Sequence, residues 1–152
     1  MRIIARLDIK LGTLIKSVMY DGVRKLGNPK DFAKDYYDNG IDELMLINNT
    51  GSLYGTKLDL NLIKEIRDKK ALPISAGGGI NSYEDAINLI QSGSDKVVIN
   101  SLIHKNPKEV VKIVDALGSS SVTGAIQFEN RNENYVTLYE MAREATELNL
   151  ID

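Results

Sequence analysis

The sequence predicts an α/β fold built from about five βα units. Short apolar runs of strand length alternate along the chain with longer amphipathic runs of helical period. The apolar runs are nearly continuous, as expected of parallel strands that are buried on both faces. Strand, helix and strand follow one another repeatedly, which favours βαβ units with right-handed crossovers. No linker or low-complexity tract divides the 152 residues, so we expect a single domain over residues 1–152.

The first half of the chain begins with a predicted strand at Arg2–Ile9 and a β-branched extension at Thr13–Val18. A helix is predicted over Lys30–Asn39, because Asn28 is a good cap and Pro29 suits the first turn. The elements expected next are a strand at Leu44–Asn48, a loop at Thr50–Thr56 and a helix at Leu58–Lys69.

The second half continues the alternation. A strand at Pro73–Ala76 is expected to end in three consecutive glycines, Gly77, Gly78 and Gly79. Ser82, with Asp85 three residues later, predicts a capped helix start, and Gly93 predicts its end. The remaining expected elements are a strand at Lys96–Asn100, a helix from Pro107 to Leu117, a strand at Ser121–Gln127 and a helix at Thr137–Leu148.

Two architectures fit this order of elements. A doubly wound open sheet of five strands suits the length directly. A (β/α)₈ barrel typically needs about 250 residues, so this chain would be an incomplete barrel. Periodicity does not choose between the two, because both contain parallel strands joined by helices.

Composition and charge exclude several classes of function. The formal net charge is -2, with 19 basic and 21 acidic residues, so no global field favours nucleic acid or an anionic membrane. The apolar runs are far shorter than a membrane span, and the first residues lack a signal-peptide pattern, so we expect a cytoplasmic protein. Cysteine is absent, and His104 is the only histidine, without partners in a ligand pattern. We therefore expect no metal and no cofactor.

Residues at the carboxyl ends of two neighbouring strands suggest a phosphate site. Glycines such as Gly78 and Gly79 let backbone N–H groups approach an anion closely. Asn100 and Ser101, after the next strand, would add an amide and a hydroxyl to the same cradle. The alternative is that the three glycines only make a tight turn from strand to helix.

Asp8 and Lys16 are the candidate reactive side chains. Asp8 ends an apolar strand, where a carboxylate could act as a general acid or base. It could equally fix the loop or pair with Lys10. Lys16 could position a phosphate or an anionic intermediate, although a lone surface lysine is commoner.

Several motifs, in this order along the chain, resemble the cyclase subunit of imidazole glycerol phosphate synthase, a barrel of the ribulose-phosphate-binding type. The resemblance covers the chain up to the fifth strand. The segments that carry it are Arg2–Lys10, Leu14–Lys16, Gly27–Pro29, Asp42–Leu44, Gly77–Ile80 and Asp95–Ser101. The glycine motif is shared with other ribulose-phosphate-binding barrels, whereas the Leu-Asp-Ile-Lys and Asp-Lys-Val-Val-Ile-Asn motifs are more specific.

The resemblance implies an incomplete TIM (β/α)₈ barrel in histidine biosynthesis. It implies a lyase that uses ammonia from a glutaminase partner to form imidazole glycerol phosphate and aminoimidazole carboxamide ribotide from a phosphorylated substrate. It places Asp8 and Lys16 at catalytic positions. It also implies phosphate binding at Gly78, Gly79, Asn100 and Ser101, and an ammonia-entrance ring that contains Arg2, Glu43 and Lys96.

The sequence departs from this family in three respects. Gln127 stands where the family has a second catalytic aspartate, and an amide cannot exchange a proton near neutral pH. Asn48 replaces an aspartate of the second strand. The chain has no counterpart to the family's last three strands, so we expect impaired catalysis.

These departures leave two other hypotheses open. The chain resembles, in part, cyclase paralogues that act with an amidotransferase in surface-sugar biosynthesis. It could also be a non-catalytic phosphate-binding module. In each case an incomplete barrel would expose unpaired strand edges, so we expect self-association or a covering partner.

Overall fold

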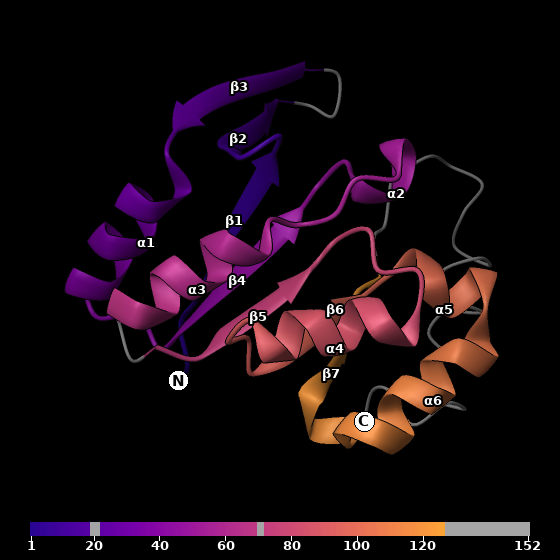
Figure 1. Cartoon of the computed structure of the whole chain (residues 1–152). Coiled ribbons are helices and arrows are strands. Elements are labelled where there is room, and N and C mark those ends of the chain that lie inside the picture. The colour runs from indigo at the N-terminus through magenta and orange to yellow at the C-terminus, as the bar shows by residue number, and fades with distance from the viewer. Residues whose placement is uncertain (19–21, 70–71, 127–152) are drawn as a thin grey trace.

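The computed structural model describes residues 1–18, 22–69 and 72–126, and a seven-stranded sheet lies at its centre (Figure 1). The order of the strands in the sheet is β3-β2-β1-β4-β5-β6-β7. The strands are β1 (Ile4–Lys10), β2 (Thr13–Val18), β3 (Gly22–Gly27), β4 (Glu43–Asn48), β5 (Ile74–Gly77), β6 (Lys96–Ile99) and β7 (Val122–Gly124).

Five of these strands run parallel and pair in the order of the chain. β1 pairs with β4, β4 with β5, β5 with β6, and β6 with β7. β2 and β3 form an antiparallel hairpin that extends the sheet beyond β1. The predicted parallel α/β architecture is therefore confirmed, and the carboxyl ends of the five parallel strands meet at one edge of the sheet.

The helices pack as one continuous layer. The helices are α1 (Pro29–Asp38), α2 (Gly51–Tyr54), α3 (Leu60–Lys69), α4 (Tyr83–Gln91), α5 (Ser101–Lys105) and α6 (Pro107–Leu117), with a 3₁₀ turn, η1, at Ser119–Ser121. α1 contacts α3, α3 contacts α4, and α4 contacts α6. In a doubly wound sheet, helices cover both faces. A single chain of neighbouring helices instead indicates a partial (β/α)₈ barrel.

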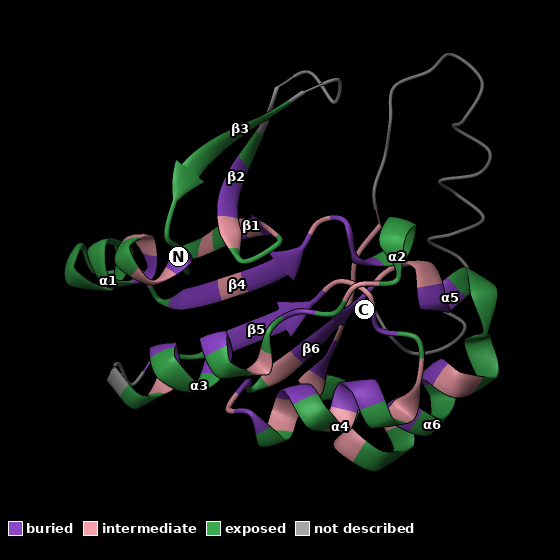
Figure 2. Cartoon of the chain, turned by 45° about the horizontal axis from the view of Figure 1, so that its top comes forward, coloured by how far each residue is buried: buried purple, intermediate pink, exposed green. Residues whose placement is uncertain are grey.

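The core lies between this helical layer and the sheet. Figure 2 shows β4 and β5 buried along almost their whole length. Leu44 and Leu46 of β4 are fully buried, and Ile63 of α3 packs in the same cluster. Fully burying one such aliphatic side chain contributes roughly 1.5–3 kcal/mol. This packing fixes the parallel strands and therefore the edge where their carboxyl ends meet.

The predicted caps are confirmed at the starts of two helices. The Asn28 side chain accepts a hydrogen bond from the Lys30 amide of α1 at 3.0 Å. Ser82 accepts one from the Asp85 amide of α4 at 3.2 Å. Such caps satisfy amides that lack an intrahelical partner, so these starts follow from local chemistry.

Three elements were not expected from the sequence. β3 was missed because Arg24 and Lys25 interrupt it and residues 23–27 are exposed, so no apolar run marks it. α2 and α5 are single short helices within segments that read as a loop or a strand end. The expected helix at Thr137–Leu148 lies outside the described residues.

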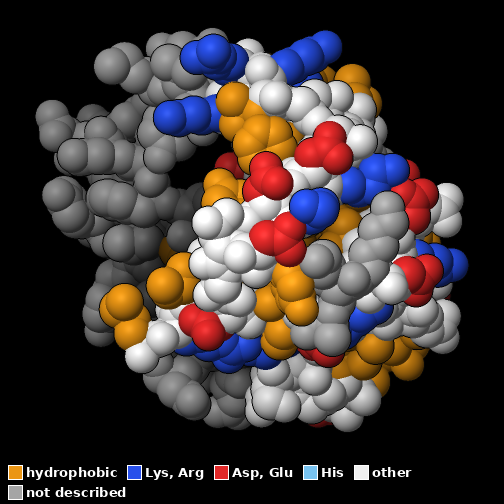
Figure 3. Space-filling model, turned by 90° about the vertical axis from the view of Figure 1, so that its left-hand side faces the viewer, with side chains coloured by type: hydrophobic (Ala, Val, Ile, Leu, Met, Phe, Trp, Pro, Cys, Tyr) orange, Lys and Arg blue, Asp and Glu red, His pale blue; other side chains and the backbone are white. Residues whose placement is uncertain are grey.

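Acidic and basic side chains are interspersed on the face that Figure 3 shows, in agreement with the near-neutral net charge of -2. Within the described ranges, no helix is long and apolar enough to cross a membrane.

Candidate functional site

A cavity of about 190 Å³ opens at the carboxyl edge of the parallel sheet. Gly78 and Gly79, which follow β5, line it together with Asn100 and Ser101, which follow β6. β5 and β6 are neighbours in the sheet, so the four residues predicted to bind phosphate lie around one space. The Asn100 side chain makes no capping hydrogen bond to α5, which leaves its amide available to a ligand.

The glycine loop is packed against the segment that follows β4. Gly78 and Gly79 have φ values of +93° and +81°. A Cβ on Gly78 would lie 2.2 Å from the Asn48 carbonyl oxygen, and a Cβ on Gly79 would lie 2.3 Å from the Thr56 carbonyl oxygen. Both positions therefore require glycine for backbone conformation and close packing. The glycines alone do not decide between a tight turn and a phosphate cradle.

Asn48 holds the loop that covers this turn. Its amide donates to the Thr56 carbonyl oxygen at 3.0 Å, and its side-chain oxygen accepts from the Thr50 amide at 3.4 Å. Asn48 is 6% exposed and also lines the cavity. An amide can donate and accept at once, whereas a carboxylate only accepts. The asparagine at this position is thus explained by the loop that it fixes.

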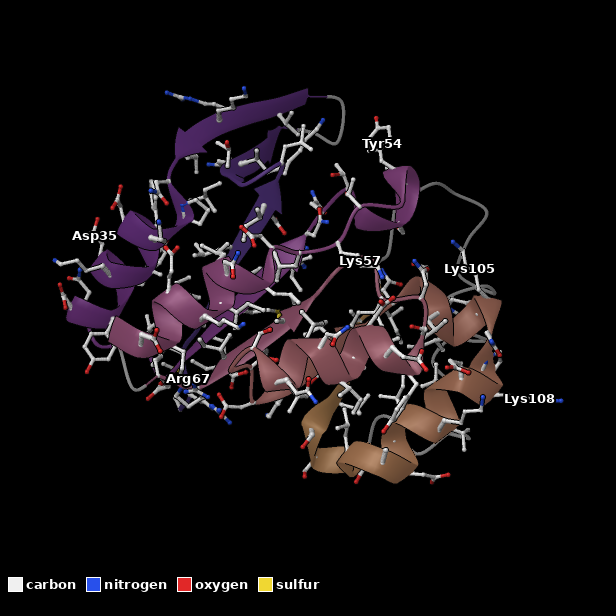
Figure 4. All side chains as sticks on the ribbon, in the orientation of Figure 1. Asp35, Tyr54, Lys57, Arg67, Lys105 and Lys108 are labelled. Carbon is white, nitrogen blue, oxygen red and sulfur yellow. The ribbon has the colours of Figure 1, made fainter. Side chains whose placement is uncertain are left out.

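An ion pair supports the glycine loop from behind. Lys57 Nζ lies 2.5 Å from Asp85 Oδ1, and Asp85 Oδ2 accepts from the Asn81 amide at 3.0 Å. Burial would raise the pKa of Asp85, but the hydrogen bonds from Lys57 and Asn81 outweigh it and hold that pKa below its ordinary value. Figure 4 shows Lys57 between α3 and α4. Asp85 therefore ties the turn after Gly79 to the start of α4.

Asp8 is linked to the cavity by an ion pair with Arg6, a residue that lines it. Arg6 Nε and Nη2 each lie 2.9 Å from Asp8 Oδ1, and Arg6 lines the cavity whereas Asp8 does not. Asp8 and Arg6 are two residues apart on β1, so both side chains project from the same face of the strand. The structure thus pairs Asp8 with Arg6 rather than with Lys10, which the sequence had suggested.

The two lysines near Asp8 have different surroundings. Lys10 Nζ lies 6.0 Å from the centroid of the Tyr54 ring, at the outer limit of a cation–π contact. Figure 4 shows Tyr54 at the outer tip of α2. Lys16 is exposed on β2, opposite Arg24 of β3, and does not line the cavity. Its catalytic role stays a prediction.

Charged residues also meet at the opposite edge of the sheet. The Arg2 guanidinium pairs with the Glu43 carboxylate, which also accepts a hydrogen bond from the Ser75 hydroxyl. Glu43 is 2% exposed, so its charge needs these partners. Lys96 on β6 is in register with Ser75. The three predicted ring residues therefore lie at the amino ends of β1, β4 and β6; their role at an ammonia entrance stays a prediction.

Two candidate positions lie outside the described residues. Gln127, which stands at the second catalytic aspartate of the resembled family, is one. The other is Asp152, which the resemblance places loosely at a fourth, acidic position of the ammonia-entrance ring. Among the described residues, no group of three or more His, Asp or Glu side chains is arranged to hold a metal ion.

Sequence reasoning missed Arg6. The signal was present, because Arg6 and Asp8 are two positions apart in a strand whose other face carries Leu7 and Ile9. A charged pair with that spacing must share the face away from the helices. Its role at the cavity depends in addition on the strand order, which brings β1 beside β4 and the glycine loop.

Comparison with known proteins assigns the family. Residues 2–152 match the family described as "Histidine biosynthesis protein". The chain is 38% identical over 152 residues to a protein of Legionella pneumophila named "Imidazole glycerol phosphate synthase subunit HisF", covering 99% of this chain and 72% of that protein. Proteins of the same name from Thermococcus onnurineus and Pyrococcus furiosus are 34% and 37% identical, with 60% and 50% of their lengths covered.

The chain spans between 50% and 72% of the length of the three relatives. It belongs to the histidine-biosynthesis family of (β/α)₈ barrels, which includes the cyclase subunit of imidazole glycerol phosphate synthase.

Proposed function

We propose that this chain acts as a cyclase subunit of imidazole glycerol phosphate synthase. In this role it uses ammonia from a glutaminase partner to form imidazole glycerol phosphate and aminoimidazole carboxamide ribotide from a phosphorylated ribulosyl substrate. The observation that carries the proposal is the family match over residues 2–152, joined to one cavity that gathers Gly79, Asn100 and Ser101. The relatives reported above all carry the synthase name, which favours this function over a sugar-modifying paralogue.

The carboxyl edge supplies the groups that this role requires. The backbone around Gly78 and Gly79 and the side chains of Asn100 and Ser101 are neutral hydrogen-bond donors around one cavity, and they bind a substrate phosphate. Asp8 exchanges protons with the reacting part of the substrate, and a positioned carboxylate typically contributes 10²–10⁴-fold to a rate. Lys16 contacts the substrate from β2.

The amino edge faces the partner. Arg2, Glu43 and Lys96 lie where three parallel strands begin, on the side opposite the cavity. Ammonia released by the glutaminase enters between these side chains and passes along the interior face of the sheet. Because the substrate occupies the carboxyl edge, the glutaminase partner binds at the amino edge, where the charged ring lies.

Turnover with ammonium salts tests this function. This chain, with the phosphorylated ribulosyl substrate, is expected to form imidazole glycerol phosphate, measured by mass spectrometry, at a reduced rate because Gln127 replaces the second catalytic aspartate. Asp8→Asn should lower the rate by at least about 10²-fold, whereas Arg24→Gln, on the exposed hairpin, should leave it unchanged. Phosphate binding without product at any ammonium concentration would instead favour a non-catalytic phosphate-binding module.

A further inference from the structure

The cavity at the carboxyl edge contains one charged side chain. Of the described residues that line it, Arg6 alone carries a charge; the others are apolar, amide, hydroxyl or glycine residues. A guanidinium binds phosphate oxygens through charge-assisted hydrogen bonds, which are roughly twice as strong as those from neutral donors. The neutral cradle around Gly79 and Asn100 therefore has a candidate counter-ion on a strand two places away from β5 in the sheet.

Arg6 is placed to reach a ligand in this space. It lies in the middle of β1, in register with Met45 of β4, and both residues line the cavity. Leu7 and Ile9 of the same strand pack into the core, so the Arg6 side chain projects from the opposite face, into the concave interior of the partial barrel. Its side chain is 45% exposed, which leaves the guanidinium accessible from the cavity.

The known contacts of Arg6 do not use all of its donors. Nε and Nη2 both approach a single oxygen, Asp8 Oδ1. A guanidinium carries five N–H groups in a planar fork, so the remaining donors can face a second oxyanion. The cavity of about 190 Å³ is lined by residues of β1 and β4 and by the segments that follow β5 and β6. A small phosphorylated ligand in it would contact residues from β1 to the end of β6.

We propose that Arg6 is an oxyanion-binding residue of this site and that Asp8 is its internal competitor. In the empty site Arg6 holds the Asp8 carboxylate. A phosphoryl oxygen bound between Asn100 and Arg6 accepts hydrogen bonds from guanidinium N–H groups that otherwise bond Asp8. The Asp8 carboxylate is thereby released from Arg6 and turns toward the ligand. This inference rests on the proposed function for the position of the phosphate, and it adds a specificity-determining residue that the catalytic scheme does not use.

The alternative role for Arg6 is purely structural. If Arg6 only neutralises Asp8, a gain in phosphate affinity from removing the Asp8 charge arises from long-range electrostatics and persists without Arg6. If Asp8 competes with the ligand for Arg6, Asp8→Asn frees the guanidinium, and the gain in affinity requires Arg6. The two roles therefore differ in whether the gain from Asp8→Asn depends on Arg6, and a general loss of folding cannot imitate a gain of affinity.

Titration of the full chain with inorganic phosphate tests the inference, by isothermal calorimetry or by chemical shifts of backbone amides at low ionic strength. Arg6→Gln should weaken binding at least tenfold, whereas Arg6→Lys should weaken it less, because a point charge remains without the fork. Arg24→Gln removes a positive charge from the exposed β3 and should change affinity less than twofold. Asp8→Asn should tighten binding several-fold, and the double variant Arg6→Gln/Asp8→Asn should lose that gain.

The outcomes separate this inference from the proposed function. Weakening by Asn100→Ala with no effect of Arg6→Gln or Asp8→Asn would overturn the role of Arg6 and leave the phosphate cradle intact. If Arg6→Gln weakens phosphate binding and Asn100→Ala has no effect, the role of Arg6 stands and the phosphate cradle of the proposed function is overturned. Failure of both the unaltered protein and Asp8→Asn to bind phosphate would overturn both. Circular dichroism of each variant confirms that the fold is retained.

Discussion

At the amino edge of the sheet, Arg67 donates to the carbonyl oxygens of Gly93 and Leu72, each at 2.9 Å, and to Asp95 Oδ2 at 2.6 Å. At the carboxyl edge, the Asn100 amide leaves α5 uncapped, and Arg6 directs two donors to one oxygen of Asp8. Arg67 is thus satisfied by the protein itself, whereas Asn100 and Arg6 keep unused donors beside a cavity.

The same contrast applies to the backbone. Asp95 Oδ2 also accepts from the Ile74 amide at 2.7 Å, so the starts of β5 and β6 and the end of α3 are joined through the side chains of Arg67 and Asp95. The carboxyl edge also has side-chain links, from Asn48 to Thr50 and Thr56 and from Asp85 to Lys57 and Asn81. It differs in that Gly78 and Gly79 pack directly against neighbouring carbonyl groups and in that donors beside the cavity remain unused. In barrels of this class the carboxyl edge carries the chemistry, and conservation at the amino edge reflects stability.

The largest effect is expected from Gly79→Ala. Gly79 has φ +81°, and an added Cβ would lie 2.3 Å from the Thr56 carbonyl oxygen. Backbone strain and overpacking together should lower the free energy of unfolding by roughly 2–5 kcal/mol, measured by urea denaturation. Gly40→Ala is the matched control, because Gly40 has φ +82° but open space around the added atom. Equal losses at both positions would show that close packing at the carboxyl edge contributes nothing beyond the φ angle.

A slightly smaller loss is expected from Arg67→Ala at the amino edge. The change removes hydrogen bonds to two carbonyl oxygens and to the Asp95 carboxylate. The free energy of unfolding should fall by about 2–3 kcal/mol, while phosphate affinity changes less than twofold. Arg67→Lys should recover little, since one ammonium cannot reach three acceptors with a planar fork. A loss of phosphate affinity without a loss of stability would contradict the division of roles between the two edges.

Asp85→Asn tests the ion pair behind the glycine loop. The pKa of Asp85 is lowered in the folded state, so its contribution to stability is complete above the unfolded-state value of about 3.9 and is lost as the pH falls through the lower folded-state value. Asp85→Asn should therefore cost about 1–2 kcal/mol at pH 7 and nothing once the unaltered carboxyl is protonated. Urea denaturation of both proteins between pH 7 and pH 2 checks this, and a constant difference across that range would exclude the ionic contribution.

The sequence predicted the frame of the molecule better than the chemistry of its site. The capped helix starts at Asn28 and Ser82 follow from interactions within a few residues, and both are confirmed. The apolar runs at Leu44–Asn48 and Lys96–Asn100 predicted parallel strands because burial on both faces leaves a clear pattern. β3 has no such pattern, since its exposed residues pack against no core.

The site depends on two kinds of contact. Some join residues that are distant in the sequence, and others join residues whose side chains project from the same face of a strand because successive side chains alternate between its faces. Asn48 stands where the resembled family has an aspartate. The hydrogen bonds of its side chain to Thr56 and Thr50 explain the asparagine, and the sequence alone does not reveal them. The pairing of Asp8 with Arg6 rather than Lys10 depends on side-chain direction within β1. That Gly79, Asn100 and Ser101 line one cavity was expected from strand order, because neighbouring parallel strands end at the same edge.

The smallest effect is expected from Tyr54→Ala, at the outer tip of α2 (Figure 4). Tyr54 is 69% exposed, and its recorded ring contact is the distant one with Lys10, at 6.0 Å. The free energy of unfolding should change by less than about 0.5 kcal/mol, and phosphate affinity should not change, because Tyr54 does not line the cavity. Leu53→Ala, next to it and 76% exposed, is the control for loss of surface area. A drop in phosphate affinity with Tyr54→Ala alone would show that the outer end of α2, and not only Ser52 at the cavity, acts on the phosphate site.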